Sequence, residues 1–232
     1  AWPPFDPPGW EEVAEMMPYT EILFPPGSRY SYSNPGVVFL GRIIERLSAE
    51  PYETYIDKQI LRPLGMRGAF FDRGPSDARA DPSQSYYEEE AGAITEAPFD
   101  FDTGITVSNG GLNAPIGDMA KWIAFIAGTP ANDQVLERSS LEEMFAPVVP
   151  VVADGMGEQN VGEGSMGLSF FLEKHQGVDL IAHSGGQNGF ISHFFIHPPS
   201  RTAYIVAFNT QSPTTRQFDA ALRDEIVRRM WR

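Results

Sequence analysis

Apolar residues near the start of the chain recur at the spacing of an α-helix. Asn34 followed by Pro35 is typical of an N-cap and a first-turn proline, and an apolar stripe follows at helical intervals. This stripe consists of Val37, Leu40, Ile44 and Leu47. We therefore expect a helix that begins near Asn34 and turns this stripe toward a core.

Further helices are predicted on the same grounds up to about residue 150. The signals that open them are Pro51, Asn113 with Pro115, and the capping-box pair Ser140 and Glu143, and a short helix is also expected over Glu11–Met17. Residues 72–110 differ, because they are rich in Pro, Gly, Ser and Asp and show little periodicity. We expect them to form a long surface excursion.

Beyond about residue 150 the pattern changes to short apolar runs that favour strands. The candidates are Met166–Leu172, Asp179–His183, Phe190–His197 and Ala203–Asn209, and a last helix carries a stripe of Phe218, Leu222, Ile226 and Met230. Consecutive strands with short connections pair antiparallel, and the helix must bury its stripe on the sheet. The predicted fold class is therefore α+β, an antiparallel β-sheet flanked by helices plus a mostly helical subdomain.

We expect one incomplete domain over residues 1–232. Its mostly helical subdomain occupies 1–150, and the antiparallel sheet with the C-terminal helix occupies 151–232.

Composition and charge exclude several classes of function. Asp and Glu outnumber Lys and Arg by 31 to 17, and the net charge of −14 argues against binding to nucleic acid or to anionic lipid. There is no cysteine, which excludes disulfides and thiol catalysis. No apolar run approaches the ~18–20 residues of a membrane span. His193 and His197 would lie ~13 Å apart on a strand, too far to share a metal ion, so we expect no metal site.

The segment Tyr32-Ser33-Asn34 is the first candidate for chemistry. A tyrosine beside a helix N-terminus lies in a positive potential that favours its phenolate, which could take a proton from a serine hydroxyl. The Asn34 amide could hold a substrate carbonyl. The alternative is that Asn34 is only an N-cap and Tyr32 only packs.

The segment His183-Ser184-Gly185-Gly186 is the second candidate. Glycines leave room for a ligand to approach the backbone, where an N–H can donate to a developing oxyanion. His183 could bind a carboxylate or steer a proton at the same strand end. The alternative is a glycine-rich turn that contains a histidine by chance.

Together the two segments resemble motifs of the serine β-lactamase and penicillin-binding-protein-like hydrolases, above all class C β-lactamases, DD-peptidases, esterases and D-aminopeptidases. Further matches are Pro63-Leu64-Gly65-Met66 and Gly110-Gly111-Leu112, so the resemblance covers nearly the whole chain. It implies a β-lactamase/transpeptidase-like fold and acyl transfer through an acyl-enzyme on serine. It also implies a small-molecule or peptide substrate, with a D-amino peptide or small ester favoured over a β-lactam, no cofactor, and a secreted or periplasmic location.

The resemblance also implies roles for individual residues. Tyr32 would be the general acid/base and Asn34 would contact the substrate amide. His183 would take the place of a lysine often found there. The N–H of Gly186 would be an oxyanion donor, with Ser184 and Gly185 completing the substrate-binding strand.

The family's Ser-x-x-Lys nucleophile is missing from this chain. The only lysines, Lys58, Lys121 and Lys174, follow Tyr55, Asp118 and Phe171 by three residues. Three explanations are open: a C-terminal portion of a longer or two-chain hydrolase, a non-catalytic binding or scaffold relative, or a different nucleophilic serine. We favour the first. It predicts that this chain alone is inactive and leaves a sheet edge for a missing N-terminal fragment or a second chain.

Overall fold

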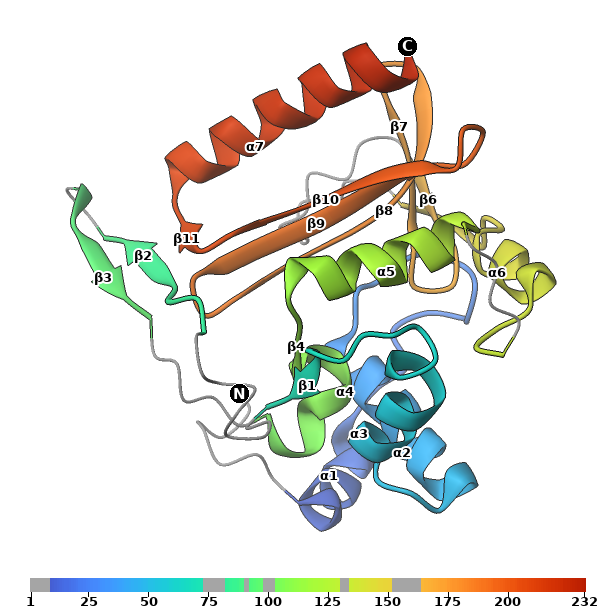
Figure 1. The fold of residues 1–232 in the computed structure, drawn as a ribbon. Helices are drawn as coiled ribbons and strands as arrows, with labels where there is room; N and C mark the ends of the chain where they lie inside the picture. The colour runs from blue at the N-terminus through green and yellow to red at the C-terminus, as the bar shows by residue number, and fades with distance from the viewer. Residues whose placement is uncertain (1–8, 73–81, 90–91, 98–102, 130–133, 152–163) are drawn as a thin grey trace.

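The computed structural model describes residues 9–72, 82–89, 92–97, 103–129, 134–151 and 164–232 (Figure 1). Its centre is a six-stranded sheet in the order β10-β9-β8-β7-β6-β5, in which every neighbouring pair is antiparallel. The strands are β5 Val149–Val151, β6 Gly164–Met166, β7 Phe171–His175, β8 Val178–Gln187, β9 Phe190–His197 and β10 Thr202–Phe208. The predicted antiparallel sheet is confirmed.

The predicted strand Ala203–Asn209 is displaced by one residue, and two other predicted strands differ from the structure by more than that. The run Met166–Leu172 divides between β6 and β7, because the four residues between these strands form a connection in which Ser169 has a φ of +66°. β8 does not end at His183 but continues to Gln187, and the turn follows at Asn188 and Gly189. Both turn residues have positive φ, +46° and +77°, as a two-residue hairpin with the matching twist requires.

Helices cover both faces of the sheet (Figure 1). They are α5, Ile116–Ala127, and α7, Pro213–Ile226, which a wider turn extends over Val227–Trp231. Ile123 of α5 belongs to the same buried cluster as Phe194 of β9, whereas Val227 belongs to the cluster on the other face with Phe195. Because successive residues of a strand point to opposite faces, β9 contributes to both cores.

The apolar stripe predicted for the last helix is only partly buried. Leu222 and Ile226 are half-buried, but Phe218 is 60 % exposed and Met230 is 55 % exposed. Trp231 is buried instead. The i→i+5 bonding of the last turn advances the chain by an extra residue, which changes the face that meets the sheet.

The remaining helices gather at one end of the molecule, except α6 (Figure 1). They are α1 Trp10–Met16, α2 Asn34–Ser48, α3 Tyr52–Ile56 with a wider turn over Asp57–Leu61, α4 Val107–Gly110, and α6 Arg138–Met144. The predicted capping box is wrong, because α6 has Glu137 as its N-cap and Ser140 lies inside the helix. Each described helix is too short or too polar to cross a membrane.

The apolar stripe predicted for α2 does not face a core. Val38 and Gly41 are the buried residues of this helix, whereas Val37, Leu40 and Leu47 are exposed. The predicted helix is confirmed, but only Ile44 of the four predicted stripe residues is even half-buried.

The region predicted as a surface excursion contains short paired strands. Inside it, β2 Tyr86–Glu88 pairs with β3 Ile94–Glu96, and β11 Thr210–Gln211 from outside the region adds to β2 in parallel. At its two ends, just outside it, β1 Phe70–Phe71 pairs with β4 Leu112–Asn113. Residues 73–81, 90–91 and 98–102 lie outside the described residues. Ser85 donates a hydrogen bond from Oγ to the carbonyl of Asn188. This contact ties the β2 segment to the turn between β8 and β9.

Candidate active site

The segment Tyr32-Ser33-Asn34 forms the entrance to α2. Ser33 is the N-cap, since its backbone is extended and its Oγ accepts a hydrogen bond from the N–H of Gly36 at 3.0 Å. The prediction that Asn34 is the N-cap is therefore wrong; Asn34 is the first helical residue, and its side chain is not needed for capping. Both Tyr32 and Asn34 are exposed, so a bound substrate could reach them.

The second predicted segment lies inside β8 rather than in a turn. Its residues pair with β9 in the register His183–Phe194, Ser184–His193, Gly185–Ser192 and Gly186–Ile191. The alternative of a glycine-rich turn is therefore wrong. β7 pairs with β8 only as far as Ala182, so no described strand pairs with the other edge of β8 beyond that residue.

The hairpin geometry determines where the backbone of Gly186 points. In a two-residue hairpin the closing pair, here Gln187 and Phe190, exchanges hydrogen bonds. The next pair, Gly186 and Ile191, is then of the non-hydrogen-bonded kind, whose N–H and C=O groups point away from the partner strand. The N–H of Gly186 is thus directed to the free edge of β8. A Cβ at neighbouring Gly185 would meet no atom within 4 Å, so the space beside it is open.

An aromatic chain of contacts connects the two segments. Tyr30 packs edge-on against Phe171 of β7, with ring centroids 5.9 Å apart, and Phe171 lies 5.6 Å from the ring of His183. Phe171 is only 2 % exposed, so these contacts belong to the core. The strand-like segment that leads to Tyr32 is therefore held against the sheet beside His183.

Helix α4 makes a second connection between the same two places. Ser108 donates a hydrogen bond from Oγ to the carbonyl of Val37, in the first turn of α2, at 3.2 Å. At the other end of α4, a Cβ on Gly110 would lie 2.8 Å from Oε1 of Gln187, so the end of β8 packs closely there. α4 thus reaches from the entrance of α2 to the end of β8.

The two segments adjoin an open face rather than an enclosed hollow. Ser184, Gly185 and Gly186 are exposed and His183 is half-buried. Cavities of about 250 and 270 Å³ lie elsewhere, one between α5 and β10 and one beside α2, α3 and α4, and neither is lined by Tyr32 or His183. A substrate at this face would need further polypeptide to exclude water from it.

Burial controls the protonation of the two aromatic groups that flank Phe171. Burial lowers the pKa of His183, against a smaller opposing effect of a backbone hydrogen bond at Ser184. The imidazole is therefore neutral at pH 7, and it cannot supply the charge of the lysine that it would replace. Burial, with a smaller contribution from Tyr32, raises the pKa of Tyr30 to about 12, so Tyr30 remains a phenol.

Each lysine of the chain is paired with a carboxylate. Lys58 binds Glu50 at 2.7 Å, Lys121 binds Asp118 at 2.6 Å, and Lys174 lies 3.2 Å from Asp179. None of these pairs belongs to the segments that carry Tyr32 or His183. The described residues therefore bring no lysine ammonium group to the candidate site.

A comparison with known protein families identifies the family of this chain. The family model described as Beta-lactamase matches residues 2–228. The chain belongs to the Beta-lactamase family. Its members include β-lactamase-fold hydrolases, so the predicted family and fold class are both confirmed.

Individual members of the family are considerably longer than this chain. The D-alanyl-D-alanine-carboxypeptidase/endopeptidase AmpH of Escherichia coli K12 is 25% identical over 216 residues, which are 89% of this chain and 51% of that protein. The penicillin-binding protein homologue of Pyrococcus abyssi superposes with a TM-score of 0.74 at 25% identity, covering 92% of this chain and 47% of that one. The chain spans about half the length of the curated relatives it matches.

A third likeness concerns the fold alone. The D-amino acid amidase of Ochrobactrum anthropi SV3 superposes with a TM-score of 0.74 at 18% identity, covering 97% of this chain and 65% of that chain. The arrangement of sheet and helices is therefore the same in a protein whose sequence has diverged much further.

Sequence reasoning missed the residues that hold the site together. Tyr30 and Phe171 position the two segments, and Ser108 joins α4 to α2. The alternation Tyr30-Ser31-Tyr32 was a signal for an extended segment with two tyrosines on one side. No sequence signal identified Ser108.

Proposed function

We propose that this chain is the substrate-binding part of a serine hydrolase that forms an acyl-enzyme, with a nucleophile supplied by polypeptide outside these 232 residues. The convergence of the α2 entrance and the free edge of β8 carries this proposal. Acyl transfer needs a proton acceptor and an oxyanion donor around one reacting carbonyl, and Tyr32 and Gly186 are of those types.

Tyr32 and Asn34 act on the nucleophile side of the substrate. Tyr32 acts as its phenolate, which takes the proton of the attacking serine, and the phenol so formed gives that proton to the leaving group. Asn34 is not the N-cap of α2, so its side-chain amide can donate and accept hydrogen bonds with the substrate amide. The helix N-terminus beside both residues favours the negative charge that develops during attack.

The β8 residues act on the carbonyl side. The N–H of Gly186 donates to the oxyanion from the free strand edge, and Ser184 and Gly185 let an extended substrate lie along that edge. His183 is neutral, so it recognises a substrate through a hydrogen bond rather than through a positive charge. A carboxylate is then held less strongly than a lysine would hold it.

These features favour a D-amino peptide or a small ester over a β-lactam. AmpH is a D-alanyl-D-alanine carboxypeptidase/endopeptidase by name and the Ochrobactrum protein a D-amino acid amidase, which supports an amide of a D-amino acid as the substrate class. We expect weak or no β-lactam turnover. Rapid nitrocefin hydrolysis by the complete protein would contradict this substrate class. The expected secreted or periplasmic location stays a prediction.

A second candidate function is a non-catalytic binding or scaffold protein with the same fold. The observation in its favour is that all three lysines are paired away from the site. Under this reading the open face binds a peptide or amide without cleaving it.

Labelling with a fluorescent penicillin or a fluorophosphonate separates the two functions. The complete product of the reading frame that encodes this chain should form a stable adduct, whereas the 232-residue chain alone should not. Tyr32→Phe should slow labelling of the complete product by about 10²–10⁴-fold, the usual contribution of general acid–base catalysis. Tyr30→Phe is the matched control and should label at nearly the original rate.

Three outcomes contradict the proposal. Labelling of the chain alone would place the nucleophile inside it. Equal losses in the Tyr32 and Tyr30 variants would remove the special role of Tyr32. A complete product that binds D-amino peptides but never forms an adduct would favour the scaffold function.

A further inference from the structure

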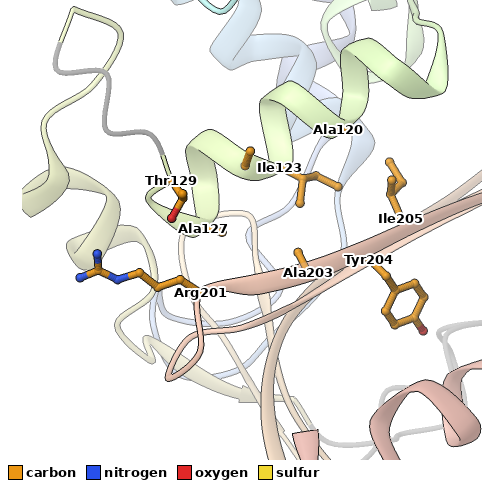
Figure 2. A pocket seen from close by; sticks show the side chains of 9 residues that line it. Ala120, Ile123, Ala127, Thr129, Arg201, Ala203, Tyr204 and Ile205 are labelled. Atoms are coloured by element: carbon orange, nitrogen blue, oxygen red, sulfur yellow. The ribbon is translucent and has the colours of Figure 1, made fainter. Parts of the chain in front are cut away.

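Helix α4 is held in place by other means than α5. α5 lies on the sheet through apolar side chains, since Ile123 shares a core cluster with Phe194 of β9. With Ala203 of β10, Ile123 also lines the groove of about 250 Å³ shown in Figure 2. α4 is only four residues long, and Val107 is its buried residue. A helix this short is unstable by itself in water, so contacts at its ends must fix its position.

Asp72 and Thr103 make such a contact just before α4. The N–H of Thr103 donates to Oδ2 of Asp72 at 3.2 Å, and its hydroxyl donates to the same carboxylate, 2.7 Å from Oδ1. Thr103 is only 4 % exposed. A buried hydroxyl without a partner is costly, and a hydrogen bond to a carboxylate is stronger than one to a neutral acceptor. The contact joins two residues that are 31 positions apart in the sequence.

The backbone of Asp72 reaches the other end of the same segment. Its φ is +42°, in the left-handed region that few residues other than glycine occupy, although aspartate tolerates it better than most. In this conformation its N–H donates to the carbonyl of Gly111 at 2.8 Å. A Cβ on Gly111 would lie 2.9 Å from both Oδ1 of Asp72 and Oγ1 of Thr103, so a larger residue there would push the pair apart. Asp72 thus holds both ends of residues 103–111, which contain α4.

The segment that Asp72 holds lies between the two halves of the candidate site. Within it, Ser108 donates to the carbonyl of Val37 in the first turn of α2. Near its end, Gly110 packs closely against the side chain of Gln187, the last residue of β8. A shift of residues 103–111 would therefore move the entrance of α2 relative to the end of β8.

We propose that Asp72 is a positioning residue for the candidate site. By holding both ends of residues 103–111 it fixes α4, and through α4 it sets the spacing between Tyr32 and the N–H of Gly186. The catalytic consequence rests on the proposed function, whereas the hydrogen bonds of Asp72 do not. The spacing matters because a displacement of ~1 Å in a reacting group can slow a reaction on the order of 10²-fold.

Four variants separate the carboxylate from the backbone conformation. Asp72→Gly keeps the left-handed conformation without strain but removes the carboxylate, whereas Asp72→Asn keeps an acceptor oxygen and tolerates the same conformation. Thr103→Val removes the hydroxyl at nearly equal volume. Asp57→Ala is the matched control, because Asp57 also binds a neighbouring side chain, Arg62 at 2.5 Å, but in the wider turn after α3.

Hydrogen exchange of the 232-residue chain tests the hydrogen bonds without any need for catalysis. Peptides that cover residues 103–111 should exchange about tenfold faster in Asp72→Gly and Thr103→Val, because their local structure opens more often. Asp72→Asn and Asp57→Ala should exchange nearly as the original chain does. Peptides of β9 should be unchanged in all four variants, which shows that the sheet stays folded.

Turnover of a small ester by the complete product of the reading frame tests the positioning role. The rate is normalised to the end point of fluorophosphonate labelling, so that only active molecules are counted. Asp72→Gly should lower kcat by about 10–100-fold, since the reacting groups are displaced. KM should change by less than about twofold, because the β8 edge that binds the substrate is intact. Asp72→Asn should recover most of kcat.

The outcomes distinguish this proposal from the proposed function. Normal kcat in Asp72→Gly, or an equal loss in Asp57→Ala, would overturn the positioning role while the proposed function stands. Faster exchange that extends to β9 would overturn it too, by showing a general loss of stability. A complete product without turnover or labelling, in which residues 103–111 still respond to Asp72→Gly, would overturn the proposed function and the positioning role with it.

Discussion

The sheet and the α2 region use their apolar residues in opposite ways. In the sheet, helices cover both faces, and central residues such as Ile196 are only 1 % exposed. In α2, the apolar stripe is turned outward, and Leu47 at its end is 83 % exposed. Both regions have equally regular hydrophobic patterns, so the difference lies in what the rest of the chain provides to cover them.

This difference concerns how much apolar surface each region buries. Apolar stripes are costly to leave in water, at about 25 cal/mol per Å² of apolar surface. The strands of the sheet bury residues such as Phe171, Leu180 and Ile196, whereas the fully buried residues of α2 are Val38 and Gly41. The candidate site lies where the two regions meet, so the well-packed sheet forms one of its sides and α2, whose apolar stripe is largely exposed, forms the other.

The largest expected effect on the free energy of unfolding comes from a residue in the core of the sheet. Phe171→Ala removes the ring that joins Tyr30 to His183 and leaves a cavity in the sheet core, which should lower the free energy of unfolding by about 3–5 kcal/mol. Urea denaturation measures this loss. Leu47→Ala is the matched change on the exposed stripe and should cost far less. Similar losses for the two variants would show that the contrast between the regions is false.

The stability of the sheet also depends on pH through His193, which lies beneath α7. Burial, with a smaller effect of Arg223, lowers the pKa of His193 to about 4, although Asp219 lies 3.2 Å away. We regard the ring as neutral, because no hydrogen bond of good geometry joins the two groups and burial dominates. The unfolded chain binds a proton near pH 6.5 and the folded chain does not, so stability is full above 6.5 and falls toward pH 4.

This linkage has an expected size of about 3 kcal/mol between pH 7 and pH 4. Burial raises the pKa of Asp219 and of Glu173, and these carboxyls act in the opposite direction at the acid end of the window. Unfolding measured at several pH values should show the fall, and His193→Gln should flatten it. A slope that is unchanged in the variant would assign the acid sensitivity to other groups.

A smaller effect is expected at the entrance of α2. Ser33→Ala removes the hydrogen bond to the N–H of Gly36 and should lower the free energy of unfolding by about 1 kcal/mol. Asn34→Ala should leave stability nearly unchanged but slow acylation of the complete product. Denaturation and labelling rates of the two variants distinguish capping from substrate contact. A larger stability loss for Asn34→Ala would return the capping role to that residue.

How far the sequence predicted this molecule depends on whether the signal was local. The strand Phe190–His197 was predicted with its true limits, because alternation and flanking turns are local signals. The sequence predicted Asn34 as the N-cap of α2, whereas the structure has Ser33 there. Both residue types are good caps, and only the backbone conformation selects one. The contact of Tyr30 with Phe171 could not be predicted, since it joins positions far apart in sequence. The partner of the α2 stripe could not be predicted either, because the described chain contains none.

The smallest expected effect on the free energy of unfolding concerns the exposed stripe of α2. Leu47→Lys exchanges an apolar side chain that is 83 % exposed on α2 for a charged one, so little packing is lost. The free energy of unfolding should stay within about 0.5 kcal/mol, as for other surface substitutions. Binding of a hydrophobic dye and self-association of the 232-residue chain should nevertheless fall, because the exposed stripe is interrupted. In the complete product the same variant should be destabilising if additional polypeptide buries this stripe. An equally small effect in both proteins would show that the stripe of α2 stays in water throughout.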